Sequence, residues 1–222
     1  MVTDVVGGSD LTLRVDGSRA LSAESVAELG AVCDAAEDGD ADGFVIVRVS
    51  GVPEPQWTSD LSVALVSKWE RGLRRLERLP AVTIAVADGD CGGIALDALL
   101  ATDYRIMLAS AKLVVPVVGG AAWPGMALYR LARQASGAAP VRKAVLFGTP
   151  IGADLAKAIG VIDEVADNAA MAIEKAMEMA AATEGTELAI RRQLMMEAPT
   201  STFEDALGVH LAACDRALRR PS

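Results

Sequence analysis

Hydrophobic and polar positions follow two different periods along this chain. Short apolar runs predict strands, and stretches with apolar residues three and four apart predict helices. The expected strands are residues 11–15, 44–50, 81–87, 104–109, 112–115 and 161–165. The expected helices are residues 23–36, 61–79, 94–102, 125–135, 139–147 and 153–159, and three more helices follow towards the C-terminus. Strands that alternate with helices predict an α/β core, and the helical last quarter predicts a packing or oligomerisation module.

Local signals set several of these boundaries. Ser22 precedes a helical pattern and is expected to cap it. Pro80 is expected to end the helix before it. The nearly continuous apolar run at 44–50 is typical of a strand in a sheet that is covered on both faces. Residues 37–43 form an acidic turn, and residues 51–60 and 117–124 are expected to be loops.

The stretch 88–97 joins an apolar strand to an apolar helix through a glycine turn. Gly92 and Gly93 allow the backbone to turn and a ligand to approach closely. The start of a helix leaves free backbone N–H groups, and its dipole favours negative charge. Asp97 lies in the first turn of this helix among apolar residues. Its carboxylate is either an exposed charge at the helix start or an acid–base group that faces a pocket.

Composition narrows the class of protein. With 222 residues the chain predicts one domain with a helical appendage. The net charge of −9 argues against a nucleic-acid binder, because phosphate affinity needs clustered cations. The three cysteines, Cys33, Cys91 and Cys214, follow no metal or disulfide spacing, so we expect no metal site and a reduced, cytoplasmic protein. Residues 1–8 do not read as a signal peptide, and no apolar run is long enough to span a membrane.

Four segments resemble the crotonase (enoyl-CoA hydratase/isomerase) superfamily. Residues 80–89 are similar to the family's strand and Asn-Gly turn, and residues 92–97 with Asp103 are similar to its Gly-Gly-Gly-x-Glu-Leu helix. Residues 146–165 resemble a further family signature, and Trp123-Pro124-Gly125 resembles the Pro-Gly step before the next helix. The resemblance covers roughly residues 11–165.

The resemblance implies an α/β fold, a crotonase-like spiral of ββα units. It divides the chain into a spiral core at residues 1–168 and a C-terminal helical trimerisation region at 169–222. It also implies a homotrimer or hexamer that acts on an acyl-CoA thioester, with coenzyme A carried by the substrate and no other cofactor. The short length and divergent pattern are similar to the auxiliary enoyl-CoA hydratases of 3,5-dihydroxyphenylglycine biosynthesis. That subgroup implies dehydration of a polyketide-derived CoA thioester towards 3,5-dihydroxyphenylacetyl-CoA.

The resemblance also implies an oxyanion hole made of two backbone N–H groups. Ile94 matches the position of the second donor. The first donor is expected near Thr58 and Ser59, beside Trp57, which resembles the family's aromatic residue. Asp97 matches the first catalytic glutamate of the hydratases, whereas Val117 stands at the position of the second. With one carboxylate, the acid–base group can still take an α proton and return it to a departing hydroxyl group.

Other residues have smaller expected roles. Cys91, Gly92, Gly93, Val117, Trp123 and Met126 are expected to line the substrate pocket. Asp103 is expected to be structural, and His210 to lie on the surface. Arg71 and Arg74, or Arg191 and Arg192 of a neighbouring subunit, are candidates for binding the phosphates of coenzyme A.

Two other classes of protein remain open. Peptidases that share the spiral fold need a Ser–His or Ser–Lys pair, and His210 has no nucleophile signature near it. A catalytically degenerate crotonase would bind a pathway enzyme or a CoA product without turnover. The valine at position 117 and the altered loop around Thr58 favour that alternative.

Overall fold

The computed structural model of the chain describes residues 10–39, 43–182 and 185–219. The expectation about residues 1–8 therefore lies outside the described part. The strands are β1 (Leu11–Asp16), β2 (Phe44–Gly51), β3 (Val82–Gly92), β4 (Tyr104–Leu108), β5 (Lys112–Val114), β6 (Val117–Val118), β7 (Ala121–Ala122), β8 (Ile151–Gly152) and β9 (Glu164–Ala166). The helices are α1 (Ala23–Asp38), α2 (Val63–Leu76), α3 (Gly93–Leu99), α4 (Met126–Gln134), α5 (Ala138–Phe147), α6 (Ala153–Ala158), α7 (Ala169–Ala180), α8 (Gly185–Glu197) and α9 (Phe203–Leu218), with a short 3-10 turn at Ala198–Thr200.

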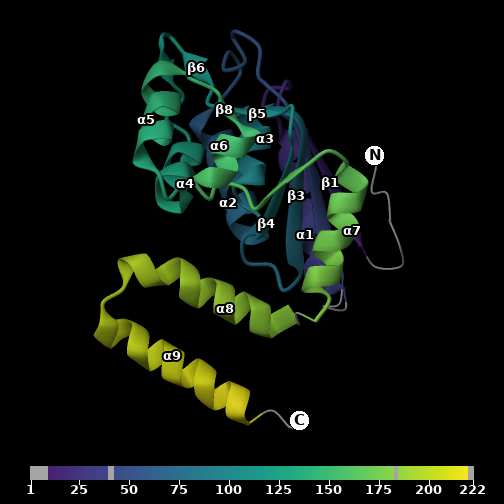
Figure 1. Cartoon of the computed structure of the whole chain (residues 1–222), viewed down its shortest axis with the longest axis vertical. Helices are drawn as coiled ribbons and strands as arrows, with labels where there is room; N and C mark the ends of the chain where they lie inside the picture. The colour runs from purple at the N-terminus through teal and green to yellow at the C-terminus, as the bar shows by residue number, and fades with distance from the viewer. Residues whose placement is uncertain (1–9, 40–42, 183–184, 220–222) are drawn as a thin grey trace.

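One sheet in the order β1-β2-β3-β4-β9 forms the centre of the molecule, and its strands run parallel. Strand β5 pairs with the end of β3 and, antiparallel, with β8. The larger core lies between the sheet and the helices that include α1, α2 and α3. A smaller core on the other face packs α7 against β2, β3 and β4 through Ala172 and Ala176 (Figure 1). The prediction of a sheet covered on both faces is confirmed.

Small aliphatic side chains build the larger core, as expected for a chain with only 4% aromatic residues. Trp69 is the exception: it is 2% exposed and belongs to α2. The Ser22 side chain caps α1 by accepting a hydrogen bond from the backbone N–H of Ser25 at 3.1 Å. The predicted cap is therefore confirmed.

Strand β3 is longer than the sequence pattern predicts. The expected turn at residues 88–93 is wrong for residues 88–92, because the strand continues to Gly92. Cys91 and Gly92 pair with Leu113 and Val114 of β5, which keeps this segment extended. The change of direction is confined to Gly93, whose φ of 54° is readily adopted by a residue without Cβ.

A small hairpin replaces part of the loop expected at 117–124. Strands β6 and β7 are joined by Gly119 and Gly120, whose φ values are 60° and 85°. Positive φ at both central residues is typical of a two-residue type I′ turn. The strand expected at 161–165 is also shifted, because β9 begins at Glu164, where pairing with β4 begins.

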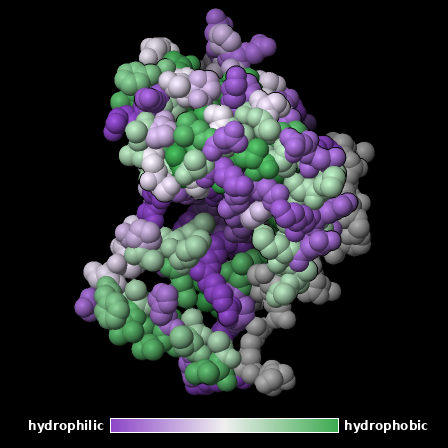
Figure 2. Space-filling view, in the orientation of Figure 1, coloured by the Kyte–Doolittle hydropathy of each residue, from purple (hydrophilic) through white to green (hydrophobic). Residues whose placement is uncertain are grey.

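The helices α8 and α9 extend away from the sheet and its covering helices (Figure 1). Figure 2 shows a hollow between these two helices and the rest of the molecule. The apolar residues Phe203, Leu207, Val209, Leu211 and Leu218 of α9 are exposed. In contrast, α7 packs on the sheet, although the expected boundary at residue 168 assigns it to the C-terminal region. No helix in the described part is both long and apolar enough to cross a membrane.

Candidate active site

A cavity of about 30 Å³ lies between α2, α3 and α4. Five residues that the sequence singled out line it: Trp57, Gly93, Ile94, Asp97 and Trp123. The rings of Trp57 and Trp123 meet edge to face, with centroids 5.2 Å apart and an interplanar angle of 72°. The cavity therefore combines an aromatic wall with the head of α3 and the carboxyl group of Asp97.

Asp97 is partly buried and faces this cavity from α3. Burial raises the pKa of its carboxyl group to about 7, and the negative charge of Glu70 adds to the shift. Arg130, the indole N–H of Trp69 and the backbone N–H of Ala127 act in the opposite direction. The Trp69 N–H lies near enough to lower the pKa, yet it makes no hydrogen bond of normal geometry to any described residue. Asp97 can therefore take up or release a proton near neutral pH.

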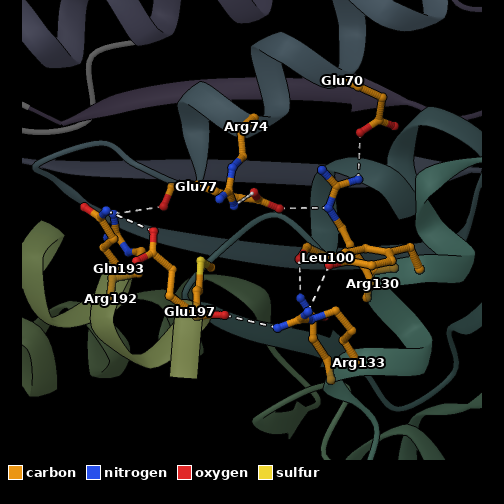
Figure 3. Close-up of polar contacts among 12 residues, drawn as sticks. Glu70, Arg74, Glu77, Leu100, Arg130, Arg133, Arg192, Gln193 and Glu197 are labelled. Carbon is orange, nitrogen blue, oxygen red and sulfur yellow. Dashed lines mark hydrogen bonds and ion pairs between the residues drawn. The ribbon is translucent and has the colours of Figure 1, made fainter. Parts of the chain in front are cut away.

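An ionic cluster centred on Arg130 joins α2 and α4 (Figure 3). Arg130 of α4 is 6% exposed and pairs with two carboxylates of α2 and its C-terminal cap. Its Nη1 atom lies 2.9 Å from Oε2 of Glu70, and its Nε atom lies 2.8 Å from Oε1 of Glu77. Burial raises the pKa of Glu70, and Arg130 opposes this shift. Of the two carboxylates, only Glu70 lines the cavity.

The head of α3 presents free backbone donors. Ile94 is the second residue of the helix, so its N–H has no acceptor within the helix, and the cap residue Gly92 supplies none from a side chain. Ile94 is buried and lines the cavity, so this N–H is a candidate oxyanion donor.

The loop expected to supply the other donor is held by its own hydrogen bonds. The backbone N–H of Ser59 donates to the carbonyl oxygen of Gln56 at 3.0 Å. Gln56 itself has a φ of 72°, which is uncommon for a residue other than glycine. The Thr58 N–H has no acceptor among the described residues, and Thr58 does not line the cavity. In this conformation Trp57 is the one residue of the loop at 51–60 that lines the cavity.

Several expected pocket residues lie elsewhere. Cys91 and Gly92 are buried in β3 behind the head of α3, and burial raises the pKa of the Cys91 thiol, which keeps it protonated. Val117 is half exposed in β6, where it lies beside Gly148. Met126 is exposed at the start of α4, although its neighbour Ala127 lines the cavity. No group of three potential ligands for a metal ion occurs within residues 10–39, 43–182 and 185–219.

The four candidate phosphate-binding arginines have different surroundings. Arg71 is exposed and donates to Ser67, and Arg74 pairs with Glu77. Arg191 pairs with Glu187 four residues away on α8. Arg192 is 4% exposed and bound within the chain, so it is not available to a CoA phosphate.

Asp103 and His210 lie where the sequence places them. Asp103 accepts hydrogen bonds from the backbone N–H and the hydroxyl group of Thr83, and it pairs with Arg192. These contacts join β3 to the C-terminal helices, which is a structural role. His210 is exposed on α9.

Sequence reasoning missed Trp69, Glu70 and Arg130. A signal existed in α4, where Ala127, Arg130 and Leu131 share one face of the helix. That face is buried, and a buried arginine requires acidic partners. The positions of those partners depend on how α2 and α4 pack, which the pattern does not contain.

A larger hollow of about 590 Å³ lies along the edge strand β1 and α1. Ile94 and Trp69 reach it, but Asp97 and the two tryptophans of the cavity wall do not. Its lining includes Arg48 and Asp88, which pair with each other at 2.9 Å. The smaller cavity is therefore the candidate active site, because Asp97 and Ile94, whose N–H has no acceptor within the helix, both line it.

The parallel sheet and its covering helices form an α/β fold of the crotonase class. Solved structures of this class include an enoyl-CoA hydratase/isomerase from Marinobacter aquaeolei, with a TM-score of 0.82, 18% identity and coverage of 98% of this chain and 90% of that chain. An enoyl-CoA hydratase/isomerase family protein from Silicibacter pomeroyi also gives a TM-score of 0.82, with 20% identity and coverage of 98% of both chains. At these identities the likeness shows the fold.

The family follows from the sequence comparison. The enoyl-CoA hydratase/isomerase family model matches residues 61–218. An enoyl-CoA-hydratase of Amycolatopsis orientalis is 57% identical over 211 residues, which cover 95% of this chain and 97% of that protein. The chain belongs to the enoyl-CoA hydratase/isomerase family, which supports an enzyme with a crotonase-type reaction on a CoA thioester.

Proposed function

We propose that this chain is an acyl-CoA lyase of the hydratase/dehydratase type. The observation that carries the proposal is the position of Asp97, a carboxyl group with a pKa of about 7 in the same cavity as the free N–H of Ile94. The proposed substrate is a polyketide-derived CoA thioester, which loses water on the route to 3,5-dihydroxyphenylacetyl-CoA. The resemblance to the auxiliary hydratases of dihydroxyphenylglycine biosynthesis supports this choice of substrate.

In the proposed mechanism the thioester oxygen accepts hydrogen bonds from Ile94 and from the loop around Thr58. Each such donor stabilises the developing enolate by about 2.7–4 kcal/mol in a site without water. The ionised Asp97 takes a proton from the α carbon. The enolate electrons then form the double bond, the C–O bond at the β carbon breaks, and the hydroxyl group leaves as water after it has accepted a proton from a carboxyl group of the cavity.

The cavity has room for water but not for an acyl chain. Substrate binding therefore requires the loop at 51–60 to move together with Trp57. Such a movement breaks the hydrogen bond from Ser59 to Gln56, and the Ser59 N–H then becomes available to a substrate oxygen. We expect the backbone to change its conformation at Gln56, whose φ lies in the left-handed region.

The proposal extends to assembly and location. We propose a homotrimer or hexamer formed through α8 and α9, supported by the exposed apolar residues of α9. Coenzyme A is carried by the substrate, and no other cofactor takes part. A cytoplasmic location is supported by the three free cysteines, Cys33, Cys91 and Cys214.

Conversion of 3-hydroxybutyryl-CoA to its enoyl-CoA tests the proposed reaction class. The wild-type protein is expected to catalyse dehydration, and Asp97→Asn to lose at least about 100-fold in turnover, as for removal of a general acid–base group. A circular dichroism spectrum equal to that of the wild type is the control for folding. Equal turnover by both proteins would contradict the role of Asp97.

A second candidate function is that of an accessory protein which binds a pathway enzyme without turnover. The valine at position 117 and the hydrogen-bonded N–H of Ser59 favour it. In that case Asp97→Asn leaves the output of the reconstituted pathway unchanged, whereas the enzymatic proposal requires the output to fall.

A further inference from the structure

A second carboxylate lines the cavity that contains Asp97. It belongs to Glu70, which comes from α2 and not from the hairpin that carries Val117. One oxygen of Glu70, Oε2, is held 2.9 Å from Nη1 of Arg130. The other oxygen, Oε1, has no hydrogen-bond partner among the described residues, and the side chain keeps 18% of its surface exposed. Glu70 therefore has a fixed position and a free oxygen.

The space beside these two acids is suited to a water molecule. A volume of about 30 Å³ is sufficient for one, and a water in a protein needs two to four polar partners. The carboxyl groups of Asp97 and Glu70 can accept its hydrogen bonds. The buried indole N–H of Trp69, which lies close to the Asp97 carboxyl group, supplies a nearby donor.

The surroundings of the two acids favour a proton on the pair. Burial raises the pKa of both carboxyl groups, and Arg130, which contacts Glu70 directly, opposes the shift of Glu70 without cancelling it. Asp97 makes no ion pair with any described residue, and the charge of Glu70 disfavours its ionisation. Two neighbouring carboxyl groups with unequal environments can share one proton, as a paired acid and base must.

We infer that Glu70 is the second acid–base group of this site, supplying from α2 the carboxylate that position 117 lacks. The inference rests on the proposed function. Dehydration proceeds from the arrangement in which the shared proton lies on Glu70. Ionised Asp97 takes the α proton of the 3-hydroxyacyl thioester, and the C–H electrons form the enolate. The enolate then forms the Cα–Cβ double bond, the C–O bond breaks, and protonated Glu70 gives its proton to the hydroxyl group, which leaves as water. Transfer of the proton from Asp97 to Glu70 restores the starting state.

Two reactions separate the roles of the two acids. Exchange of the α hydrogen of butyryl-CoA for deuterium needs only Asp97 and the oxyanion donors, whereas dehydration of 3-hydroxybutyryl-CoA also needs Glu70. Both are measured for the wild type, Glu70→Gln and the matched control Glu77→Gln. Glu77 is the other partner of Arg130, but it does not line the cavity.

The expected result is a loss of about 100-fold or more in dehydration by Glu70→Gln, with α exchange retained. Glu77→Gln is expected to keep both reactions, although with lower stability. Equal dehydration by the Glu70→Gln and Glu77→Gln variants would overturn the inference while leaving the proposed function intact. A wild type that catalyses neither reaction would overturn the proposed function and the inference with it.

If Glu70→Gln does not fold, Glu70→Ala with added formate takes its place. Formate can occupy the vacated space and supply a carboxyl group. Recovery of dehydration on addition of formate supports the inference, and no recovery at any formate concentration contradicts it.

Discussion

At the scale of single residues, the surroundings of Asp97 disfavour its ionised form. Its folded-state pKa of about 7 lies above its ordinary value of 3.8, and burial is the main cause. When folding raises the pKa of an acid, its protonated form stabilises the fold. This stabilisation is fully present at a pH below the acid's ordinary pKa, and it is lost as the pH rises through the folded-state pKa. Ionised Asp97 therefore destabilises the fold above neutral pH, in the range where we propose that it acts as a base.

Replacement of Asp97 by asparagine removes this cost. At a pH of about 8 we expect Asp97→Asn to raise the free energy of unfolding by about 1–3 kcal/mol, and at a pH of about 4 to change it little. Urea denaturation at the two pH values measures the difference. An equal effect of the substitution at both pH values would contradict the raised pKa.

The sequence predicted part of the candidate site at this scale. The family resemblance identified Asp97, Ile94, Trp57 and Trp123, and the structure brings all four to one cavity. It did not identify Glu70, because no motif marks this residue. Its place in the cavity depends on the packing of α2 against α3 and α4, which no local pattern contains.

At the scale of elements, the strands and helices followed from periodicity, but two connections did not. β3 continues through Gly92 because β5 pairs with it, and β5 lies about twenty residues further along the chain. The hairpin of β6 and β7 had a local signal, the Gly119-Gly120 pair between apolar dipeptides, which the expectation of a loop overlooked.

Arg192 attaches α8 to the rest of the molecule. Its Nη1 donates to the carbonyl oxygen of Leu79 at 2.6 Å, its Nη2 donates to that of Ala81 at 3.1 Å, and it pairs with Asp103. The Arg192 side chain is almost fully buried, and so are Leu79 and Ala81, so water cannot replace the guanidinium group as the donor to these two carbonyl groups. This polar attachment positions the C-terminal helices.

Removal of this attachment is expected to release α8. Arg192→Ala leaves the carbonyl oxygens of the buried residues Leu79 and Ala81 without this donor, which costs about 1–3 kcal/mol for each unpaired group. Hydrogen exchange of the α8 amides measures the release and is expected to become faster. The control is Arg191→Ala, which removes a largely exposed arginine that pairs with Glu187 within α8, and it is expected to change stability by less than about 1 kcal/mol. Similar exchange rates in the two variants would contradict the role of Arg192.

At the scale of the whole molecule, the apolar surface of α9 is unusual for a single chain in water. Phe203, Leu211 and Leu218 are each more than half exposed, and no described residue of α9 is buried. Figure 2 shows apolar residues along the C-terminal helices. The chain carries a net charge of −9, and repulsion between like-charged chains opposes nonspecific association. The proposed oligomer interface through α9 accounts for this contrast.

The oligomeric state tests that interface. Light scattering after size exclusion is expected to give the mass of three or six chains of 23.0 kDa for the wild type. The double variant Leu207→Glu/Leu211→Glu is expected to give single chains, because ionised side chains are costly to bury. Val63→Glu, at an exposed apolar residue of α2, is the matched control and is expected to keep the wild-type mass. A wild type that elutes as single chains would contradict the proposal.

The general architecture was predictable because it depends on patterns that extend over many residues. The continuous apolar run of β2 correctly indicated helices on both faces of the sheet, and α7 supplies the second layer. The orientation of α8 and α9 was not predictable, since it is set by a few polar contacts such as those of Arg192.

The central claim is that Asp97 removes a proton from the α carbon of a CoA thioester. Proton NMR of butyryl-CoA in deuterium oxide measures this step directly, without requiring the physiological acyl group. We expect the wild-type protein to catalyse loss of the α-hydrogen signal, and Asp97→Asn to slow it by about 100-fold or more. Equal exchange by the two proteins, or none above the uncatalysed rate with the wild type, would contradict the account.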